Sequence, residues 1–140
     1  MKALTIRQPY ASLIALGEKQ YETRDWKTAY RGPLAIHAGA HVPKRDDFWM
    51  CQSNVWRVLD QHGLSSDVKK LPRSAVLCIV RLEDCIPAEV LTAQGLLNWS
   101  EWLFGDYTDG RYGWKLSMVE VFAEPIPASG KLGLWEWLRP

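Results

Sequence analysis

Apolar and polar positions alternate in short segments, which predicts short strands and short helices. Pro9 and Gly17 bracket one apolar segment, an arrangement typical of a helix. Ser74 to Leu82 is a dense apolar run typical of a strand buried on both faces, with Leu77 and Ile79 on one side. Strands are expected at residues 2–6, 19–26, 34–38, 74–82 and 111–122, an extended tail at 134–138, and helices at 10–16, 46–63, 87–95 and 96–104. Because these elements interleave without regular βαβ spacing, we expect a mixed α+β domain around a small barrel.

Length and composition are those of a single globular domain spanning residues 1–140. The chain has 140 residues, 47% of them hydrophobic and 24% charged, which excludes a largely disordered protein. No apolar run approaches the roughly 18 residues of a membrane span, so no membrane association is expected. The N-terminus lacks the apolar stretch of a signal peptide, and the three cysteines have no CxxC spacing. We therefore expect reduced thiols and a cytoplasmic location.

Charge is segregated along the chain, although the net charge is only +1. Residues 1–45 carry eight basic and three acidic side chains, whereas residues 46–110 carry five basic and ten acidic ones. A basic N-terminal third can present an electropositive surface to a phosphate or carboxylate. An evenly solvated surface is the alternative.

The segment from Gly17 to Arg24 concentrates charged side chains directly after the first expected helix. On a strand, Glu22 and Arg24 point the same way, about 7 Å apart, and Lys19 at the head of the strand could approach them. The cations suit a phosphate, the carboxylate suits a base amino group, and the cluster could also adapt Lys19 as a general base. A ladder of surface ion pairs is the alternative.

A second set of candidates could recognise a nucleotide. Arg7 and Arg31 could bind phosphate, Gln8 could pair with an adenine edge, and Tyr10 could stack on a base. A helix cap is the alternative role for Gln8, and packing is the alternative for Tyr10. Among the eight tryptophans, Trp26 lies next to the charged strand and is a candidate stacking platform.

The histidines do not predict a metal site. His37 and His41 have an HxxxH spacing, but the residues between them are not convincingly helical, and only His62 lies elsewhere. His37 is expected to be either a cleft residue or a satisfied core histidine. No phosphate-binding glycine-rich loop, GxSxG elbow or Cys–His nucleophile pair is visible, so neither a metal nor another cofactor is expected.

Three segments together resemble the ASCH domain (activating signal cointegrator homology): LTIRQPYA from residue 4, GEKQYETR from residue 17 and YRGPLAIHAG from residue 30. The GxKxxExR signature of that family is complete in Gly17, Lys19, Glu22 and Arg24. The resemblance implies a PUA-like fold, that is, a small mixed β-barrel flanked by short helices. It also implies recognition of RNA or of a modified nucleotide.

Some small relatives that resemble this family are amidohydrolases that deacylate N4-acetylcytidine. They use a lysine, a threonine three residues later and a glutamate from a central strand. Lys19 matches the lysine, Glu22 stands at the threonine position, and the strand glutamate would fall near Glu83. A carboxylate at Glu22 would have to activate water instead of attacking directly. Other relatives are proposed to cleave single-stranded RNA, for which Lys19, Tyr10, Arg31 and Arg24 could serve.

The leading prediction is a module that binds single-stranded RNA or a nucleotide. A hydrolase with Lys19 as general base, aided by Glu22 and Glu83, is the alternative, and a protein-binding scaffold is a third possibility. No prediction is made for the oligomeric state. The binding residues expected in the first case are Arg7, Gln8, Tyr10, Lys19, Glu22, Arg24, Trp26, Arg31 and His37.

Overall fold

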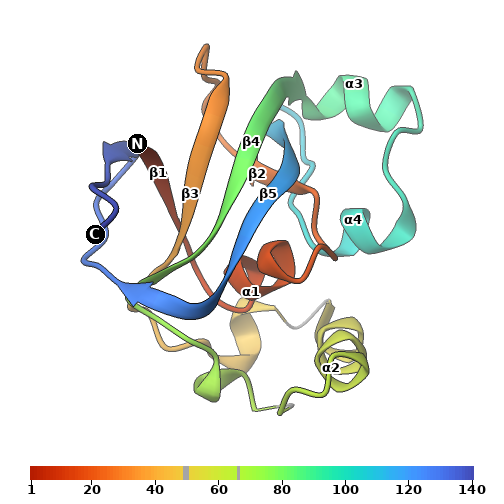
Figure 1. Ribbon diagram of the computed structural model, residues 1–140. Coiled ribbons are helices and arrows are strands. Elements are labelled where there is room, and N and C mark those ends of the chain that lie inside the picture. The colour runs from red at the N-terminus through yellow and green to blue at the C-terminus, as the bar shows by residue number, and fades with distance from the viewer. Residues whose placement is uncertain (49–50, 66) are drawn as a thin grey trace.

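A computed structural model describes residues 1–48, 51–65 and 67–140 and contains a six-stranded mixed sheet (Figure 1). The strand order is β2-β5-β4-β3-β1-β6, in which β1 and β3 are parallel and the other neighbouring pairs are antiparallel. The strands are β1 (Lys2–Ile6), β2 (Tyr21–Arg24), β3 (Gly32–Ala38), β4 (Ala75–Pro87), β5 (Tyr112–Pro127) and β6 (Leu134–Glu136). The helices are α1 (Tyr10–Ala15), α2 (Gln52–Gln61), α3 (Ala88–Ala93) and α4 (Trp99–Leu103), with 3-10 turns at Arg45–Asp47 and Val68–Lys70.

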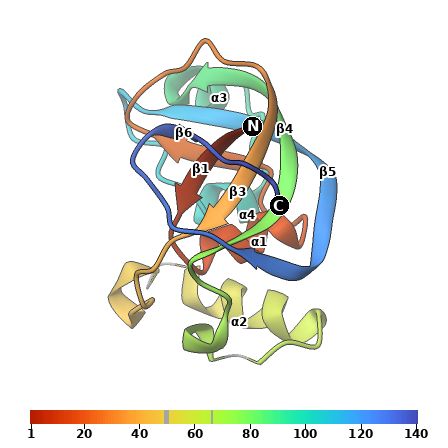
Figure 2. The ribbon, with the colours of Figure 1, turned by 60° about the vertical axis from the view of Figure 1, so that its left-hand side comes forward.

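The sheet curls into a half-barrel. Three strands separate β2 from β1 in the sheet, yet the Arg24 guanidinium on β2 donates to the Thr5 carbonyl on β1 at 2.7 Å. Helix α1 covers the concave face, where Ile14 packs against Ile36 and Trp114. Helix α2 lies beyond the end of the sheet, on the far side of α1 (Figure 2). The predicted α+β barrel-like fold with short flanking helices is confirmed.

Strand β4 is buried on both faces along its first half, as its sequence predicts. One face packs into the concave core, and the other lies under Trp135 and Trp137 of the C-terminal segment. The simple alternation predicted for this strand is wrong at its start, where Val76 and Leu77 each lie on the side opposite to the one predicted. Leu77 joins the concave core whereas Ile79 faces the tryptophans, because a register shift between Val76 and Cys78 breaks the two-residue period.

Helix α1 ends as its sequence predicts, and a turn at Gly17 leads from it to the next strand. Gly17 adopts a φ of +77°, the left-handed conformation that glycine tolerates without strain. The Leu13 carbonyl then accepts from the backbone N–H groups of Glu18 and Lys19 at 3.0 and 3.1 Å. Strand β2 begins at Tyr21, later than expected, and the Glu101 carboxylate accepts from the backbone N–H groups of Gln20 and Tyr21 at this point.

The long helix predicted between Asp46 and Gly63 is divided in the structure. A 3-10 turn spans Arg45–Asp47, α2 begins at Gln52, and residues 49–50 of the predicted helix lie outside the described residues. Val55 and Leu59 of α2 pack with Leu13 of α1 and with Phe104 after α4, forming a second core. No helix within the described ranges is long and apolar enough to cross a membrane.

Candidate functional site

Lys19 is buried at the junction of α1, β2 and α4. Its ammonium Nζ donates to the Phe104 carbonyl at 2.6 Å and lies 3.8 Å from Oε1 of Glu22. The side chain is only 1% exposed. Burial lowers the pKa of Lys19, because the charged form is poorly solvated there, and the nearby carboxylate of Glu22 opposes this effect. The lysine predicted as a phosphate contact is therefore sealed from solvent.

Glu22 and Arg24 continue from Lys19 along one face of β2. Glu22 Oε1 accepts from the backbone N–H of Thr23 at 3.1 Å, and Oε2 lies 3.5 Å from Nη2 of Arg24. The same Nη2 donates to the Thr5 carbonyl. The ammonium of Lys19, the carboxylate of Glu22 and the guanidinium of Arg24 thus form one contiguous group, which we call the charged row.

Arg24 is the accessible end of this row, with 26% of its side chain exposed. Its hydrogen bonds to described residues all use Nη2. Its buried Nε has no partner among the described residues. A guanidinium has five N–H donors, so Arg24 keeps donors that a phosphate or carboxylate could accept from.

Tyr10 lies beside the row, half-buried between α1 and α2. Its ring centroid is 5.8 Å from Nζ of Lys19, and its hydroxyl donates to the Asp47 carbonyl at 3.2 Å. The hydroxyl also lies 3.9 Å from Sγ of Cys51. Burial raises the pKa of Tyr10 above its usual value, so the phenol stays protonated at neutral pH.

Gln8 and His37 have the structural roles that the sequence left open as alternatives. The buried Gln8 amide accepts from the Ser12 N–H at 2.9 Å and donates to the Ser12 hydroxyl and the Pro72 carbonyl. The buried His37 donates from Nε2 to the Ala128 carbonyl at 2.7 Å, and its Nδ1 lies 3.2 Å from the Thr5 hydroxyl. These polar atoms are bonded within the chain and are not presented to a ligand.

Arg31 and Glu83 bond to residues outside the row, whereas Arg7 lies two residues beyond Thr5, which binds Arg24. Arg31 precedes the start of β3, whereas Arg7 follows the end of β1, which pairs in parallel with β3. These two residues are therefore more than about 20 Å apart along the strands. Glu83 is exposed, accepts from the Ser117 hydroxyl at 2.7 Å and lies near Arg81.

Trp26 follows β2 and is half-buried. It packs edge-on against the fully buried Trp114, with ring centroids 4.8 Å apart. Its backbone carbonyl accepts from the Trp114 indole N–H. Trp26 therefore has a packing role, and only part of its ring surface is open to a base.

Glu101 on α4, which was not among the predicted site residues, orders the start of β2. This buried carboxylate accepts from the backbone N–H groups of Gln20 and Tyr21 at 2.6 and 3.3 Å. Burial raises its pKa above the usual 4.5. A signal was available, because Asn98 stands three residues before Glu101 at capping spacing, and its side chain accepts from the Glu101 N–H.

Two hollows lie elsewhere on the surface. One, of about 260 Å³, lies between the end of α1 and the second half of β5, and the other, of about 370 Å³, lies between α3 and α4. Neither is lined by Lys19, Glu22 or Arg24. Within residues 1–48, 51–65 and 67–140, no three His, Cys, Asp or Glu side chains are grouped to hold a metal ion.

Comparison with known proteins supports the resemblance seen in the sequence. The model of the ASCH domain family matches residues 4–126. Two solved structures are similar: ASCH from Zymomonas mobilis and a tyrosine-to-phenylalanine mutant of the same protein, ZmASCH. The mutant structure has a TM-score of 0.55 and 16% sequence identity, and the match covers 99% of this chain and 89% of that chain. The unmutated structure has a TM-score of 0.54 and 16% sequence identity, and the match covers 99% of this chain and 87% of that chain. No curated protein sequence matches the chain. The family model covers most of the chain and contains the whole charged row, and the chain therefore belongs to the ASCH domain family.

Proposed function

We propose that this protein binds single-stranded RNA, or a nucleotide, through the row formed by Lys19, Glu22 and Arg24. The ASCH domain is a PUA-like fold family associated with RNA binding. The observation that carries the proposal is the partly exposed Arg24 guanidinium, which is held in place by Thr5 and Glu22 and still has free donors. A fixed guanidinium with free donors suits a phosphate or a base acceptor.

The three side chains have different roles in this proposal. Arg24 contacts the ligand, and the Glu22 carboxylate beside it accepts from a base amino group. The buried Lys19 holds the Glu22 side chain in place rather than touching RNA. Arg7 is exposed two residues beyond Thr5 and adds positive charge near Arg24.

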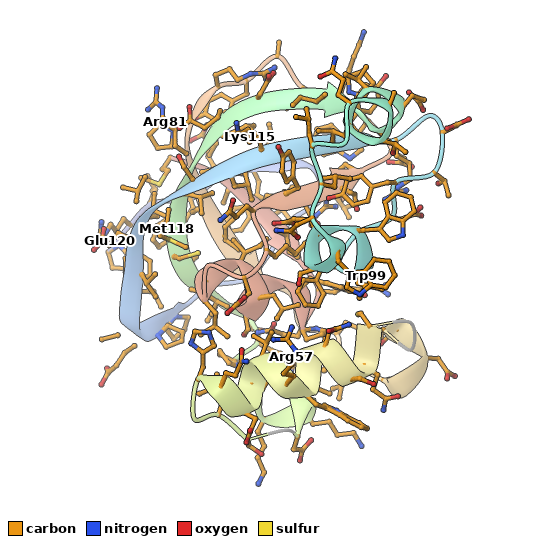
Figure 3. All side chains as sticks on the ribbon, turned by 90° about the vertical axis from the view of Figure 1, so that its right-hand side faces the viewer. Arg57, Arg81, Trp99, Lys115, Met118 and Glu120 are labelled. Atoms are coloured by element: carbon orange, nitrogen blue, oxygen red, sulfur yellow. The ribbon has the colours of Figure 1, made fainter. Side chains whose placement is uncertain are left out.

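The test is binding of a fluorescent single-stranded RNA octamer, measured by anisotropy over a range of salt concentrations. We expect the Arg24→Ala variant to bind about tenfold more weakly and to reduce the slope of log affinity against log salt by about one. Arg57→Ala is the matched control, because Arg57 is an exposed arginine on α2 that bonds only to Asn54 and Gln61 among the described residues (Figure 3). Absence of wild-type binding at low salt would overturn the proposal.

Hydrolysis is the second candidate, and one observation favours it. Burial lowers the pKa of Lys19, which increases the fraction of the neutral amine that could act as a base. Glu83 is exposed and bonded to Ser117, whereas the Lys19 ammonium is buried against Phe104 and Glu22. Incubation with labelled single-stranded RNA and with N4-acetylcytidine separates the candidates. Turnover that is lost in Lys19→Met would support an enzyme, and binding without product would support the RNA-binding module.

A further inference from the structure

A second surface, separate from the charged row, lies on α3, α4 and the loop between them. We call it the aromatic surface because Trp99 and Trp102 lie on it. Trp99 is 70% exposed and Trp102 is 44% exposed, which is unusual for tryptophan. Figure 3 shows Trp99 on the side of the molecule where these helices lie. Both tryptophans line the hollow of about 370 Å³, which has room for a planar ring of nucleobase size. Its other lining residues are Leu91, Thr92, Gly95, Leu97 and Asn98.

Trp102 already forms part of an aromatic stack. Its ring lies nearly parallel to that of the buried Tyr107, at an angle of 11° with the centroids 5.8 Å apart. Tyr107 covers Trp102 from the protein side, and the indole remains open to solvent over almost half its surface. A planar aromatic ligand placed on the open side would extend the stack outward.

Hydrogen bonds connect the segment that carries the aromatic surface to the segment that carries the charged row. Helix α4 carries Glu101, which binds the backbone at the start of β2, and is followed by Phe104, whose carbonyl accepts from Lys19. Asp106, between Phe104 and Tyr107 in the chain, donates its N–H to the Thr23 hydroxyl, which lies on the opposite face of β2 from Glu22 and Arg24. The aromatic surface and the charged row therefore lie on the two faces of one four-residue strand, and an RNA strand that reaches both has to pass along β2.

We propose that the hollow between α3 and α4 is a subsite for an unpaired base of the same RNA strand, which stacks on Trp102 beside Trp99. This inference rests on the proposed function. Asn98 offers its amide N–H₂ to the base edge, since its Oδ1 already accepts from the Glu101 N–H. Stacking without a fixed hydrogen-bond pattern tolerates any base, so the subsite would add affinity rather than sequence specificity.

Charge around the hollow favours a base over a phosphate. Arg111, four residues after Tyr107 in the chain, is paired with Asp106 at 3.5 Å. Glu89 on α3 adds negative charge and accepts from the Gly110 N–H. Phosphate would be repelled here, whereas a neutral aromatic ring would not. We therefore place the contacts with the RNA phosphates at Arg24 and not in this hollow.

The experiment compares two ligands, a mononucleotide and a single-stranded RNA octamer, for wild type and for Trp99→Ala, Trp102→Ala and Trp102→Tyr. We expect Trp102→Ala to lower affinity for the octamer about tenfold, with mononucleotide affinity unchanged. Trp102→Tyr should keep most of the affinity. Because Trp99 is so exposed, its alanine variant tests the same surface without disturbing the core, and we expect it to lose about threefold.

The salt dependence separates this subsite from the charged row. The tryptophan variants should keep the wild-type salt slope, because stacking releases no counterions, whereas Arg24→Ala should reduce it. Trp56→Ala is the matched control, since Trp56 is 41% exposed on α2, outside the hollow. Unchanged octamer affinity in both Trp99→Ala and Trp102→Ala would overturn the subsite and leave the proposed function standing. Absence of any wild-type RNA binding would overturn the proposed function, and the subsite with it.

Discussion

Replacing Lys19 tests whether a buried ion pair holds the charged row together. Lys19→Met keeps a straight apolar side chain of nearly the same length and removes the ammonium group. That group donates to the Phe104 carbonyl at 2.6 Å and lies 3.8 Å from Glu22, whose own side chain is only 10% exposed. The substitution therefore leaves a buried carbonyl without its donor and a buried carboxylate without one of its two cations.

The expected cost follows from these two losses. A hydrogen bond to a charged group contributes about 1.5–3 kcal/mol, and removing one partner of a buried ion pair costs about 3–5 kcal/mol. Arg24 still lies 3.5 Å from Glu22 and compensates part of the charge, so we expect the low end of this range. The free energy of unfolding should fall by about 3 kcal/mol, which corresponds to a drop in Tm of about 10 °C for a chain of this size.

A double-mutant cycle with Glu22→Gln isolates the pair. With a neutral amide at position 22, Lys19→Met no longer leaves a carboxylate unpaired, so its cost should be smaller by at least about 1 kcal/mol. Urea unfolding followed by tryptophan fluorescence measures all four proteins. Wild-type stability in Lys19→Met, or strict additivity of the two substitutions, would refute a buried Lys19–Glu22 pair.

Three further predictions concern stability. Burial raises the pKa of Glu101 above 4.5, so folding favours its protonated form. The stability of the wild type relative to Glu101→Gln should therefore rise as the pH falls through the folded pKa towards 4.5. Urea midpoints measured over this pH range test this, and parallel pH profiles of the two proteins would contradict it. Gly130→Ala should cost about 1–3 kcal/mol in thermal melts, because a Cβ there would lie 2.7 Å from both Cε1 of His37 and Oγ1 of Thr5. Tyr107→Phe should be neutral or stabilising by about 1 kcal/mol, because its buried hydroxyl has no partner among the described residues, and a clear loss of stability would reveal one.

Local signals in the sequence predicted most of the elements near the site. Pro9 and Gly17 marked the ends of α1, and the apolar run beginning at Ser74 marked β4. The alternation of side chains along a strand predicted that Glu22 and Arg24 lie on one face of β2, and their charged groups are 3.5 Å apart in the structure. The ASCH signature likewise pointed to the family, whose model matches residues 4–126.

Burial of the individual side chains was not predictable in the same way. For Gln8 the sequence left both a base-reading amide and a helix cap open; the structure shows a fully buried amide that bonds to Ser12 and to the carbonyl of Pro72, 64 residues away. Arg31 looked like a neighbour of Arg7 in a basic N-terminal third, but the parallel pairing of β1 with β3 places them at opposite ends of the strands.

Local sequence is enough to specify the short helices and strands, the end of α1 at Gly17 and the family signature, because each depends on neighbouring residues and a short period. The burial of Lys19 and the accessibility of Arg24 at the end of the row arise from the three-dimensional packing of the chain. The partner of Lys19, the Phe104 carbonyl, lies 85 residues away, and Arg24 reaches Thr5 only because the sheet curls. Exposure depends on such contacts between distant segments, and no local pattern of residues records them.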